Sequence, residues 1–399
     1  MKKTLYLAVC LSFLCVGCLQ AADAPIVDVP VIILSSDTDE AQVRSAVFSP
    51  DGQTIVTASA DATARIWDVQ TGKEFQKLEG HQSQVRSAVF FPDGKKVLTK
   101  SDDDARIWDA ESGKELQKFP LNRVNNFAVL SPEGKKIALI GAWPNKNVLI
   151  YDSESGKEIQ RLGGHAGNTT SVVFSPDGKK IATAGWDGSN AEGWEAYIRI
   201  WDTDSDSANF GRELRAWTDQ VREGVSVTVT FSPDSKKIIS HDTENRRDAT
   251  SVRIWDVDSG KELQTLKHRR EIKTAVFSPD GSKIVTACGD GVGRIWDVES
   301  GEELHLLEGH YSTCAFAVFS PDGKQVVTGC GVSFVTGIEG GHVLVFDADS
   351  GEMLHRLLGH RGLVRFGAFS PDGKKIASIS SDNIRIWDLS AIRIEEENQ

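Results

Sequence analysis

The chain has 399 residues, a formal net charge of −12, and 36 glycines against 12 prolines. This acidic balance argues against a nucleic-acid-binding protein and against binding to anionic lipid surfaces. With 40% hydrophobic and 8% aromatic residues, the composition fits a folded, turn-rich β protein and not a disordered chain.

The first residues have the layout of a secretory signal peptide. Lys2 and Lys3 precede an apolar run that ends at Leu19, and small residues follow it. We therefore expect residues 1–22 to be removed and the mature protein to be periplasmic or extracellular, with no membrane insertion after processing. The residues ending at Cys18 resemble a bacterial lipobox, so a lipid anchor at Cys18 is the alternative.

Three cysteines remain after this segment, and an odd count in an exported protein implies at least one unpaired thiol. Cys314 and Cys330 lie at similar distances from the turn between them. We expect them to face each other across a hairpin, either as a disulfide or as two buried thiols.

The rest of the chain repeats one unit, which is clearest from Ile272 to His310. Short β-branched runs alternate with turns such as Ser278-Pro279-Asp280-Gly281, in which proline presets φ for a type I turn. Each unit predicts four antiparallel strands joined by three turns. The turn signature occurs eight times, and so does an aromatic residue followed by aspartate at the end of the third run. The sequence therefore predicts an all-β protein.

A period near 40 to 45 residues with Gly-His and Trp-Asp signatures resembles the WD-repeat β-propeller family, here in an exported, bacterial-type form. The resemblance implies an eight-bladed propeller with four antiparallel strands per blade, closed into a ring and monomeric. It also implies the domain limits. A strand within residues 23–38 closes the last blade, the eight repeats occupy 39–389, and 390–399 form an acidic tail. The alternative closing strand is Ile392 to Ile394.

In this family a histidine, a serine or threonine, an aspartate and a tryptophan tie each blade together by hydrogen bonds. The resemblance gives three blades the complete set: His165, Thr183, Asp187 and Trp201; His268, Thr286, Asp290 and Trp296; and His360, Ser378, Asp382 and Trp387. The second repeat leaves its aspartate open between Asp102 and Asp103. The fifth repeat lacks a clear set, and the seventh has Phe346 in place of tryptophan.

The family resemblance also places one residue of each first strand at the mouth of the central channel. In four repeats this residue is basic: Arg44, Arg86, Lys273 and Arg365. We expect these residues to bind an acidic peptide or protein on the top face, because arginine forks bind carboxylates in a bidentate manner. Trp186 and Trp194 are the candidate aromatic anchors. The alternative is that the basic residues only solvate the channel mouth and pair with nearby acids.

The expected function is a non-catalytic scaffold that binds a protein or peptide outside the cytoplasm, without a cofactor or metal. No nucleophile motif, phosphate loop or dinucleotide fingerprint stands out in the sequence. Asp202, Asp204, Asp206 and Glu213 have EF-hand spacing, but they belong to recurring turn elements. The alternative function is a hydrolase-like propeller enzyme with acidic groups in the channel.

Overall fold

The computed structural model describes residues 30–34, 42–120, 128–140, 147–163, 165, 167–190, 193–219, 227–242, 250–310, 312–331, 340–381 and 383–391. The side chains of residues 120, 187–190, 193–195 and 391 are outside this description. Several predicted features therefore lie outside the described residues: the signal segment 1–22 with Cys18, Asp382, the strand Ile392 to Ile394, and the side chains of Asp187 and Trp194.

Eight four-stranded antiparallel sheets form the described part of the chain, which confirms the predicted all-β, eight-bladed propeller. The first blade consists of β2 (Val43–Phe48), β3 (Thr54–Ser59), β4 (Ala64–Asp68) and β5 (Glu74–Leu78). The second consists of β6 (Val85–Phe90), β7 (Lys96–Ser101), β8 (Asp104–Asp109) and β9 (Glu115–Pro120). The third consists of β10 (Ala128–Leu130), β11 (Lys136–Ile140), β12 (Val148–Asp152) and β13 (Glu158–Leu162). The fourth consists of β14 (Thr169–Phe174), β15 (Lys180–Asn190), β16 (Gly193–Asp202) and β17 (Glu213–Asp219).

The remaining four blades follow in the same order along the chain. The fifth consists of β18 (Val227–Phe231), β19 (Lys237–Asp242), β20 (Thr250–Asp256) and β21 (Glu262–His268). The sixth consists of β22 (Ile272–Phe277), β23 (Lys283–Cys288), β24 (Gly293–Asp297) and β25 (Glu303–Leu307). The seventh consists of β26 (Cys314–Phe319), β27 (Gln325–Cys330), β28 (His342–Asp347) and β29 (Met353–Leu358). The eighth consists of β30 (Val364–Phe369), β31 (Lys375–Ser380), β32 (Ile384–Asp388) and β1 (Val31–Leu34), and the short 3-10 helix η1 (Leu389–Ala391) follows β32.

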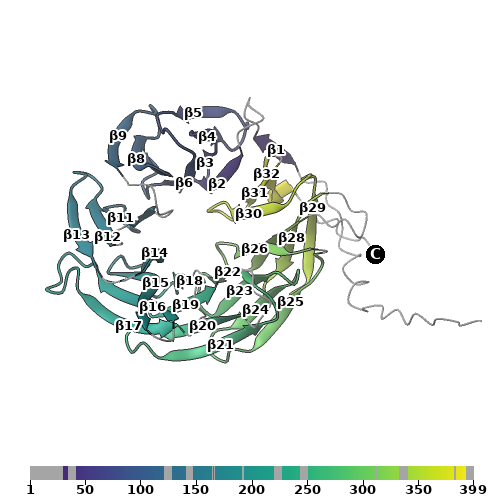
Figure 1. Ribbon diagram of the computed structural model, residues 1–399. Coiled ribbons are helices and arrows are strands. Elements are labelled where there is room, and N and C mark those ends of the chain that lie inside the picture. The colour runs from purple at the N-terminus through teal and green to yellow at the C-terminus, as the bar shows by residue number, and fades with distance from the viewer. Residues whose placement is uncertain are drawn as a thin grey trace, which may run out of the picture.

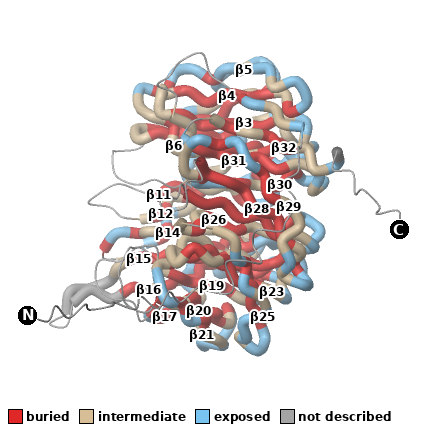
Figure 2. Tube along the Cα trace, turned by 90° about the vertical axis from the view of Figure 1, so that its right-hand side faces the viewer, coloured by how far each residue is buried: buried red, intermediate tan, exposed pale blue. Residues whose placement is uncertain are grey.

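The first strand of each blade lies beside the central opening and the fourth lies at the outer edge (Figure 1). The hydrophobic core is divided among the spaces between neighbouring blades, and one cluster joins Ile66 and Leu78 of the first blade to Val85 and Trp108 of the second. Buried residues accordingly run through the strands, while exposed residues gather at the turns (Figure 2). Each blade covers the apolar face of its neighbour, as expected for a repeat protein.

A serine–aspartate hydrogen bond shapes the turn between the first two strands of most blades. In the first blade Ser49 Oγ donates to Asp51 Oδ1 at 2.6 Å, and Gly52 N–H donates to the Ser49 carbonyl at 2.8 Å. Gly52 has a φ of 70°, which favours glycine. In the fifth blade Ser235 takes this position with a φ of 62°, and its hydroxyl accepts the Asp177 N–H at 3.2 Å. The repeated motif is thus turn chemistry and not a functional site.

The eighth blade takes its outer strand from the other end of the chain. Strand β1 pairs antiparallel with β32, with Leu34 opposite Ile384, and the Asp388 N–H donates to the Pro30 carbonyl at 3.1 Å. Leu34 is buried in the cluster that joins the eighth blade to Trp67 of the first. Pairing of the two ends covers the edge of β32, which would otherwise expose unpaired backbone groups. The domain limits at residues 22, 38 and 389 stay predictions.

Candidate interaction surface

The four basic residues predicted at the channel mouth all occupy β-bulges of inner strands. The pairing of β2 with β3 skips Arg44, and the pairing of β6 with β7 skips Arg86. Lys273 on β22 and Arg365 on β30 are skipped in the same way. A bulge leaves one residue out of the ladder and re-aims its side chain. Four cationic side chains therefore leave the ladder at equivalent points around the channel.

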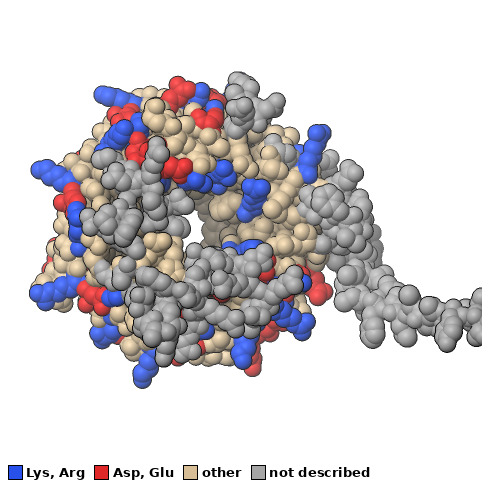
Figure 3. Space-filling view, viewed as in Figure 1, with Lys and Arg blue, Asp and Glu red and all other residues tan. Residues whose placement is uncertain are grey.

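The three arginines among these bulge residues lie on one arc of the ring. Arg365, Arg44 and Arg86 lie on the inner strands of the eighth, first and second blades, which are neighbours because β2 contacts both β6 and β31. Thr170 and Ala315 hold the same bulge position in β14 and β26, so the basic character is not a property of the bulge itself. Lys and Arg side chains gather beside the central opening in Figure 3. We call Arg44, Arg86 and Arg365 the basic arc.

The members of the basic arc differ in how far their charge is already paired. Arg86 forms an ion pair with Asp102, with Nε 2.7 Å from Oδ1, and the pKa of that carboxyl is lowered, chiefly by this hydrogen bond. Arg44 is exposed and donates to the neutral Gln84 side chain at 3.1 Å. Arg365 is exposed and forms no ion pair with any other described residue. Arg44 and Arg365 thus retain the charge that a bound carboxylate would meet.

Lys273 lies apart from the arc, and its ammonium is 3.5 Å from a carboxylate oxygen of Glu271.

Trp186 is half-buried and packs against the core cluster of the fourth and fifth blades. A side chain that already packs within its own protein offers less surface to a partner. The structure therefore supports Trp186 less strongly than the arginines, and the side chain of Trp194 lies outside the described residues.

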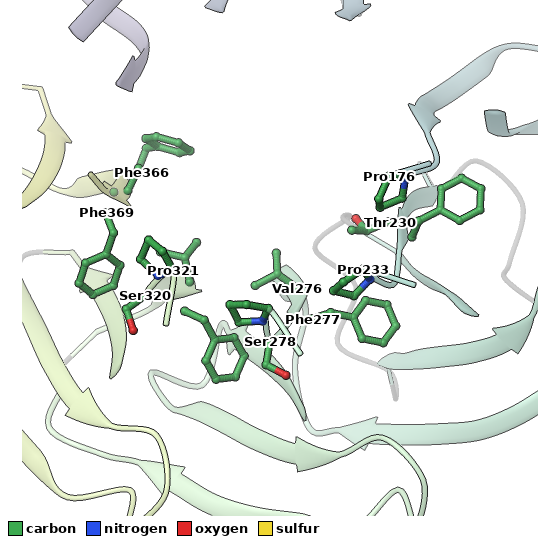
Figure 4. Close-up of a pocket in the computed structure, with 16 residues that line it drawn as sticks. Pro176, Thr230, Pro233, Val276, Phe277, Ser278, Ser320, Pro321, Phe366 and Phe369 are labelled. Atoms are coloured by element: carbon green, nitrogen blue, oxygen red, sulfur yellow. The ribbon is translucent and has the colours of Figure 1, made fainter. Parts of the chain in front are cut away.

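An apolar hollow of about 600 Å³ is lined by the inner strands and following turns of the fifth to eighth blades, together with Pro176 of the fourth. Phe366, Val276 and Pro321 lie along its wall (Figure 4). The prolines belong to the turns that follow the inner strands, whereas the basic bulges occur where these strands begin. The channel is thus basic at one end and apolar toward the other.

In the three blades predicted to have a complete set, the histidine, the serine or threonine and the tryptophan meet through a single hydroxyl. Thr286 Oγ1 accepts the Trp296 indole N–H at 3.0 Å and lies 2.9 Å from His268 Nε2. The equivalent distances to Thr183 are 3.0 Å from Trp201 and 2.9 Å from His165. Ser378 is 2.7 Å from both His360 and Trp387. Because the hydroxyl and the indole of each set bond to one another within the blade, we interpret these residues as framework.

The aspartate predicted for the sixth blade has a different partner. Asp290 Oδ2 lies 2.6 Å from the Arg294 guanidinium, while His268 Nδ1 donates to the Leu266 carbonyl at 3.1 Å. Burial lowers the pKa of His268 to about 4, so this imidazole is neutral at physiological pH. The set in this blade is therefore three residues, because the longer and permanently charged Arg294 takes the carboxylate.

In the second blade the aspartate is neither Asp102 nor Asp103 but Asp104. Its Oδ1 accepts the His81 Nδ1–H at 2.5 Å, and its Oδ2 accepts the Arg106 guanidinium at 2.8 Å. Both Asp104 and Arg106 are buried. The sequence could have identified Asp104, because side chains alternate between the two faces of a strand. Residues two and four positions before Trp108 therefore lie on the same face of β8 as Trp108.

The fifth blade also has a network that its sequence does not suggest. The Trp255 indole donates to Ser240 Oγ at 2.9 Å, and the buried Asp219 pairs with Arg253. Asp219 comes from the end of β17, outside the repeat pattern. Burial raises the pKa of Asp219 despite the nearby guanidinium.

The EF-hand spacing does not produce converging carboxylates. Asp202 accepts the Ser207 hydroxyl at 2.6 Å and the Asp204 N–H at 2.9 Å. Glu213 pairs with Arg199 on the neighbouring strand. These groups close a turn and pair across strands, as their place in the repeat pattern predicts.

The family model described as WD domain, G-beta repeat matches residues 29–68, 72–109, 156–190, 260–297, 301–347 and 351–388. The chain belongs to the WD-repeat family. A WD-repeat protein generally serves as a non-catalytic scaffold for protein–protein interaction.

Two curated relatives share part of this repeat array. Eukaryotic translation initiation factor 3 subunit I of Anopheles gambiae is 28% identical over 172 residues, which are 40% of this chain and 53% of the relative. Periodic tryptophan protein 2 of Arabidopsis thaliana is 21% identical over 258 residues, which are 62% of this chain and 26% of the relative. The chain therefore spans about half of the first relative and about a quarter of the second.

The crystal structure of the computationally designed Ika8 protein matches 89% of this WD-repeat chain and 99% of its own, with a TM-score of 0.69 and 21% sequence identity. At this identity the likeness concerns the fold alone. It covers nearly the whole ring of both chains.

The predicted export is contradicted by the relatives, which also give the bacterial-type qualifier no support. They are eukaryotic, and a translation initiation factor acts inside the cell, so these relatives point to a cytoplasmic or nuclear location. The signal segment 1–22 itself lies outside the described residues and stays a prediction. Within the described residues, no helix has the length and apolar character needed to cross a membrane.

Proposed function

We propose that this WD-repeat protein is a scaffold that binds a partner protein through acidic groups seated on the basic arc. The observation that carries the proposal is the set of bulges that direct Arg365, Arg44 and Arg86 out of successive inner strands. The chain as a whole has a net charge of −12, so this arc is a local exception to its charge. Complementary charge speeds association and selects the partner more than it adds affinity.

The local pairing indicates which residues contribute most. Arg44 and Arg365 can receive a carboxylate without giving up an existing ion pair. Arg86 would have to share its guanidinium with Asp102, whose carboxylate also accepts the Gln84 amide at 3.0 Å. The apolar hollow lies further along the same channel, so a partner segment with acidic residues followed by apolar ones fits both features.

Reversing the two less engaged charges should weaken binding of an acidic probe. We expect the double variant Arg44→Glu/Arg365→Glu to bind a fluorescein-labelled oligoglutamate peptide at least about tenfold more weakly, a loss of about 1.4 kcal/mol. Fluorescence anisotropy at low and physiological salt measures this, and salt should weaken the binding of the native protein, because exposed charges are screened.

The matched control reverses two lysines away from the channel. Lys114 lies in the turn between β8 and β9, and Lys267 lies on the outer strand β21; both are exposed. Lys114→Glu/Lys267→Glu makes the same change in net charge and should alter the affinity less than about twofold. Equal weakening by the two double variants would show that net charge alone governs binding, and would contradict the proposal.

A further inference from the structure

Three side chains of types that can bind a metal lie together in the seventh blade, outside the proposed interaction surface. His310 precedes β26, Cys330 ends β27 and His342 begins β28, and one ligand atom from each lies within 4.8 Å of the others. Cys330 and His342 are buried, and the two imidazole rings stack with their centroids 5.7 Å apart. Three separate segments thus bring a thiol and two imidazoles to one point.

The second blade shows what these positions do when they carry ordinary hydrogen-bonding groups. There, Asp104 accepts hydrogen bonds from His81 at 2.5 Å and from the Ser101 hydroxyl at 2.8 Å. The strand register of the seventh blade places a cysteine where Ser101 lies and a histidine where Asp104 lies. A carboxylate that accepts hydrogen bonds from His81, Ser101 and Arg106 is therefore replaced by an imidazole, and the hydroxyl is replaced by a thiol.

The seventh blade also leaves His310 oriented for a ligand role. Its Nε2 is 2.7 Å from Thr328 Oγ1, whereas its buried Nδ1 has no hydrogen-bond partner among the described residues. In the second blade the Trp108 indole donates to the equivalent Thr99 hydroxyl at 2.7 Å. Phe346 replaces this tryptophan and has no N–H, so Thr328 can accept the Nε2–H of His310. Metal-bound imidazoles ordinarily donate their second N–H in this way.

We propose that His310 Nδ1, Cys330 Sγ and a ring nitrogen of His342 bind a zinc ion that ties the seventh blade together. Two imidazoles and one thiolate suit Zn²⁺, and the fourth tetrahedral position is left for water. On binding, the Cys330 thiol releases its proton to solvent as the Zn–S bond forms, and each imidazole uses a nitrogen lone pair. With zinc–ligand bonds of about 2.0 to 2.3 Å, ligand atoms lie roughly 3.3 to 3.6 Å apart. The separations in the structure are at most 4.8 Å, so only a small contraction is needed.

The pKa values of Cys330 and His342 indicate the protonation states of these side chains when no metal is bound. Burial raises the pKa of the Cys330 thiol to about 12, and burial together with the Arg356 guanidinium lowers the pKa of His342 to about 4. The imidazoles are therefore neutral, as metal binding requires, whereas the thiol must lose its proton when the metal binds. Arg356 on β29 favours the thiolate but opposes a second cation, so the site should bind zinc more weakly than a site with several thiolates.

A cobalt titration tests the proposal, because a Co²⁺–thiolate bond has a charge-transfer absorption that other ligands do not produce. The full-length protein is first dialysed against a chelator and then titrated with Co²⁺, after which Zn²⁺ displaces the cobalt. We expect the thiolate band to saturate at about one equivalent of metal and to disappear as Zn²⁺ is added. Cys330→Ser should lack the band.

The sixth blade supplies the matched control. Cys288 ends β23 as Cys330 ends β27, but Val292 stands where the seventh blade has His342. Cys288→Ser should therefore bind cobalt like the native protein. The double variant Cys330→Ser/His342→Asp places the serine and aspartate of the second blade at these two positions and removes two of the three ligands, so it should bind Zn²⁺ at least about a hundredfold more weakly. Absence of the band from the native protein, its persistence in Cys330→Ser, or its loss in Cys288→Ser would overturn the proposal.

Discussion

Replacing Asp104 by alanine is expected to lower the free energy of unfolding by about 3 to 5 kcal/mol, because it removes one partner from a buried charge pair. The carboxylate accepts hydrogen bonds from His81 at 2.5 Å, from Ser101 at 2.8 Å and from Arg106 at 2.8 Å. Alanine would leave the His81 Nδ1–H buried without this acceptor and Arg106 with only Glu115 at 2.6 Å, while the Ser101 hydroxyl keeps the backbone carbonyl of residue 104 at 3.1 Å. Urea denaturation of the full chain measures the change.

Asp102 provides the control for this prediction, since it lies two residues away and forms an ion pair with Arg86 that is about one-third exposed. Asp102→Ala should cost less than about 1 kcal/mol, as is usual for surface ion pairs. Similar unfolding midpoints for the two variants would show that Asp104 is not the central acceptor of this blade.

The cost of the Asp104 substitution should also depend on pH. Burial alone would raise the pKa of this carboxyl, but hydrogen bonds from Arg106 and Ser101 and the nearby positive charge hold it well below its usual value. A folded-state pKa below the unfolded value of about 3.9 gives stability that is present above pH 4 and lost as the pH falls below it. The difference between native and Asp104→Ala should therefore be constant near neutral pH and shrink in acid.

Replacing Leu34 by alanine is expected to cost about 2 to 5 kcal/mol, the range for a buried leucine. Leu34 is 3% exposed and packs between Ile384 of the eighth blade and Trp67 of the first, where the two ends of the ring meet. A cavity at this point also weakens the pairing of β1 with β32. Thermal and urea unfolding should both shift.

The Ile33→Ala variant separates the contribution of buried side-chain packing from that of strand propensity. Ile33 lies on the same strand and is 45% exposed. Ile33→Ala should change the stability by less than about 0.5 kcal/mol, since exposed substitutions rarely do more. An Ile33→Ala variant as unstable as Leu34→Ala would mean that β1 contributes through its backbone pairing and not through its buried side chain.

The propeller could be predicted from the sequence because the turn residues, the strand pattern and the spacing of the repeats all indicate the same fold. The serine, proline, aspartate and glycine of each turn fix where strands end, and the spacing of Trp67, Trp108 and Trp296 fixes where third strands lie. Propensity, pattern and turn chemistry then specify one fold. The inner-strand positions of the basic arc could likewise be named from the resemblance to the family.

Partner choices within the blades could not be predicted in the same way. Whether a carboxylate pairs with an imidazole or a guanidinium depends on side-chain reach, so Asp290 was assigned to His268 although Arg294 takes it. Asp104 was missed because the run of three aspartates offers competing candidates. The cluster of His310, Cys330 and His342 has no local spacing motif, since its members meet only through strand pairing.

Site-specific photocrosslinking in the native cells tests most directly whether the partner binds at the channel mouth. Phe366, beside Arg365 on β30, is 38% exposed, and Phe75 on the outer strand β5 is 54% exposed. With p-benzoylphenylalanine at each position in turn, a discrete protein adduct should form from position 366, weaken when Arg44 and Arg365 are reversed, and be absent from position 75. An adduct that forms from position 75 and not from 366, or one indifferent to the reversals, would contradict binding on the basic arc.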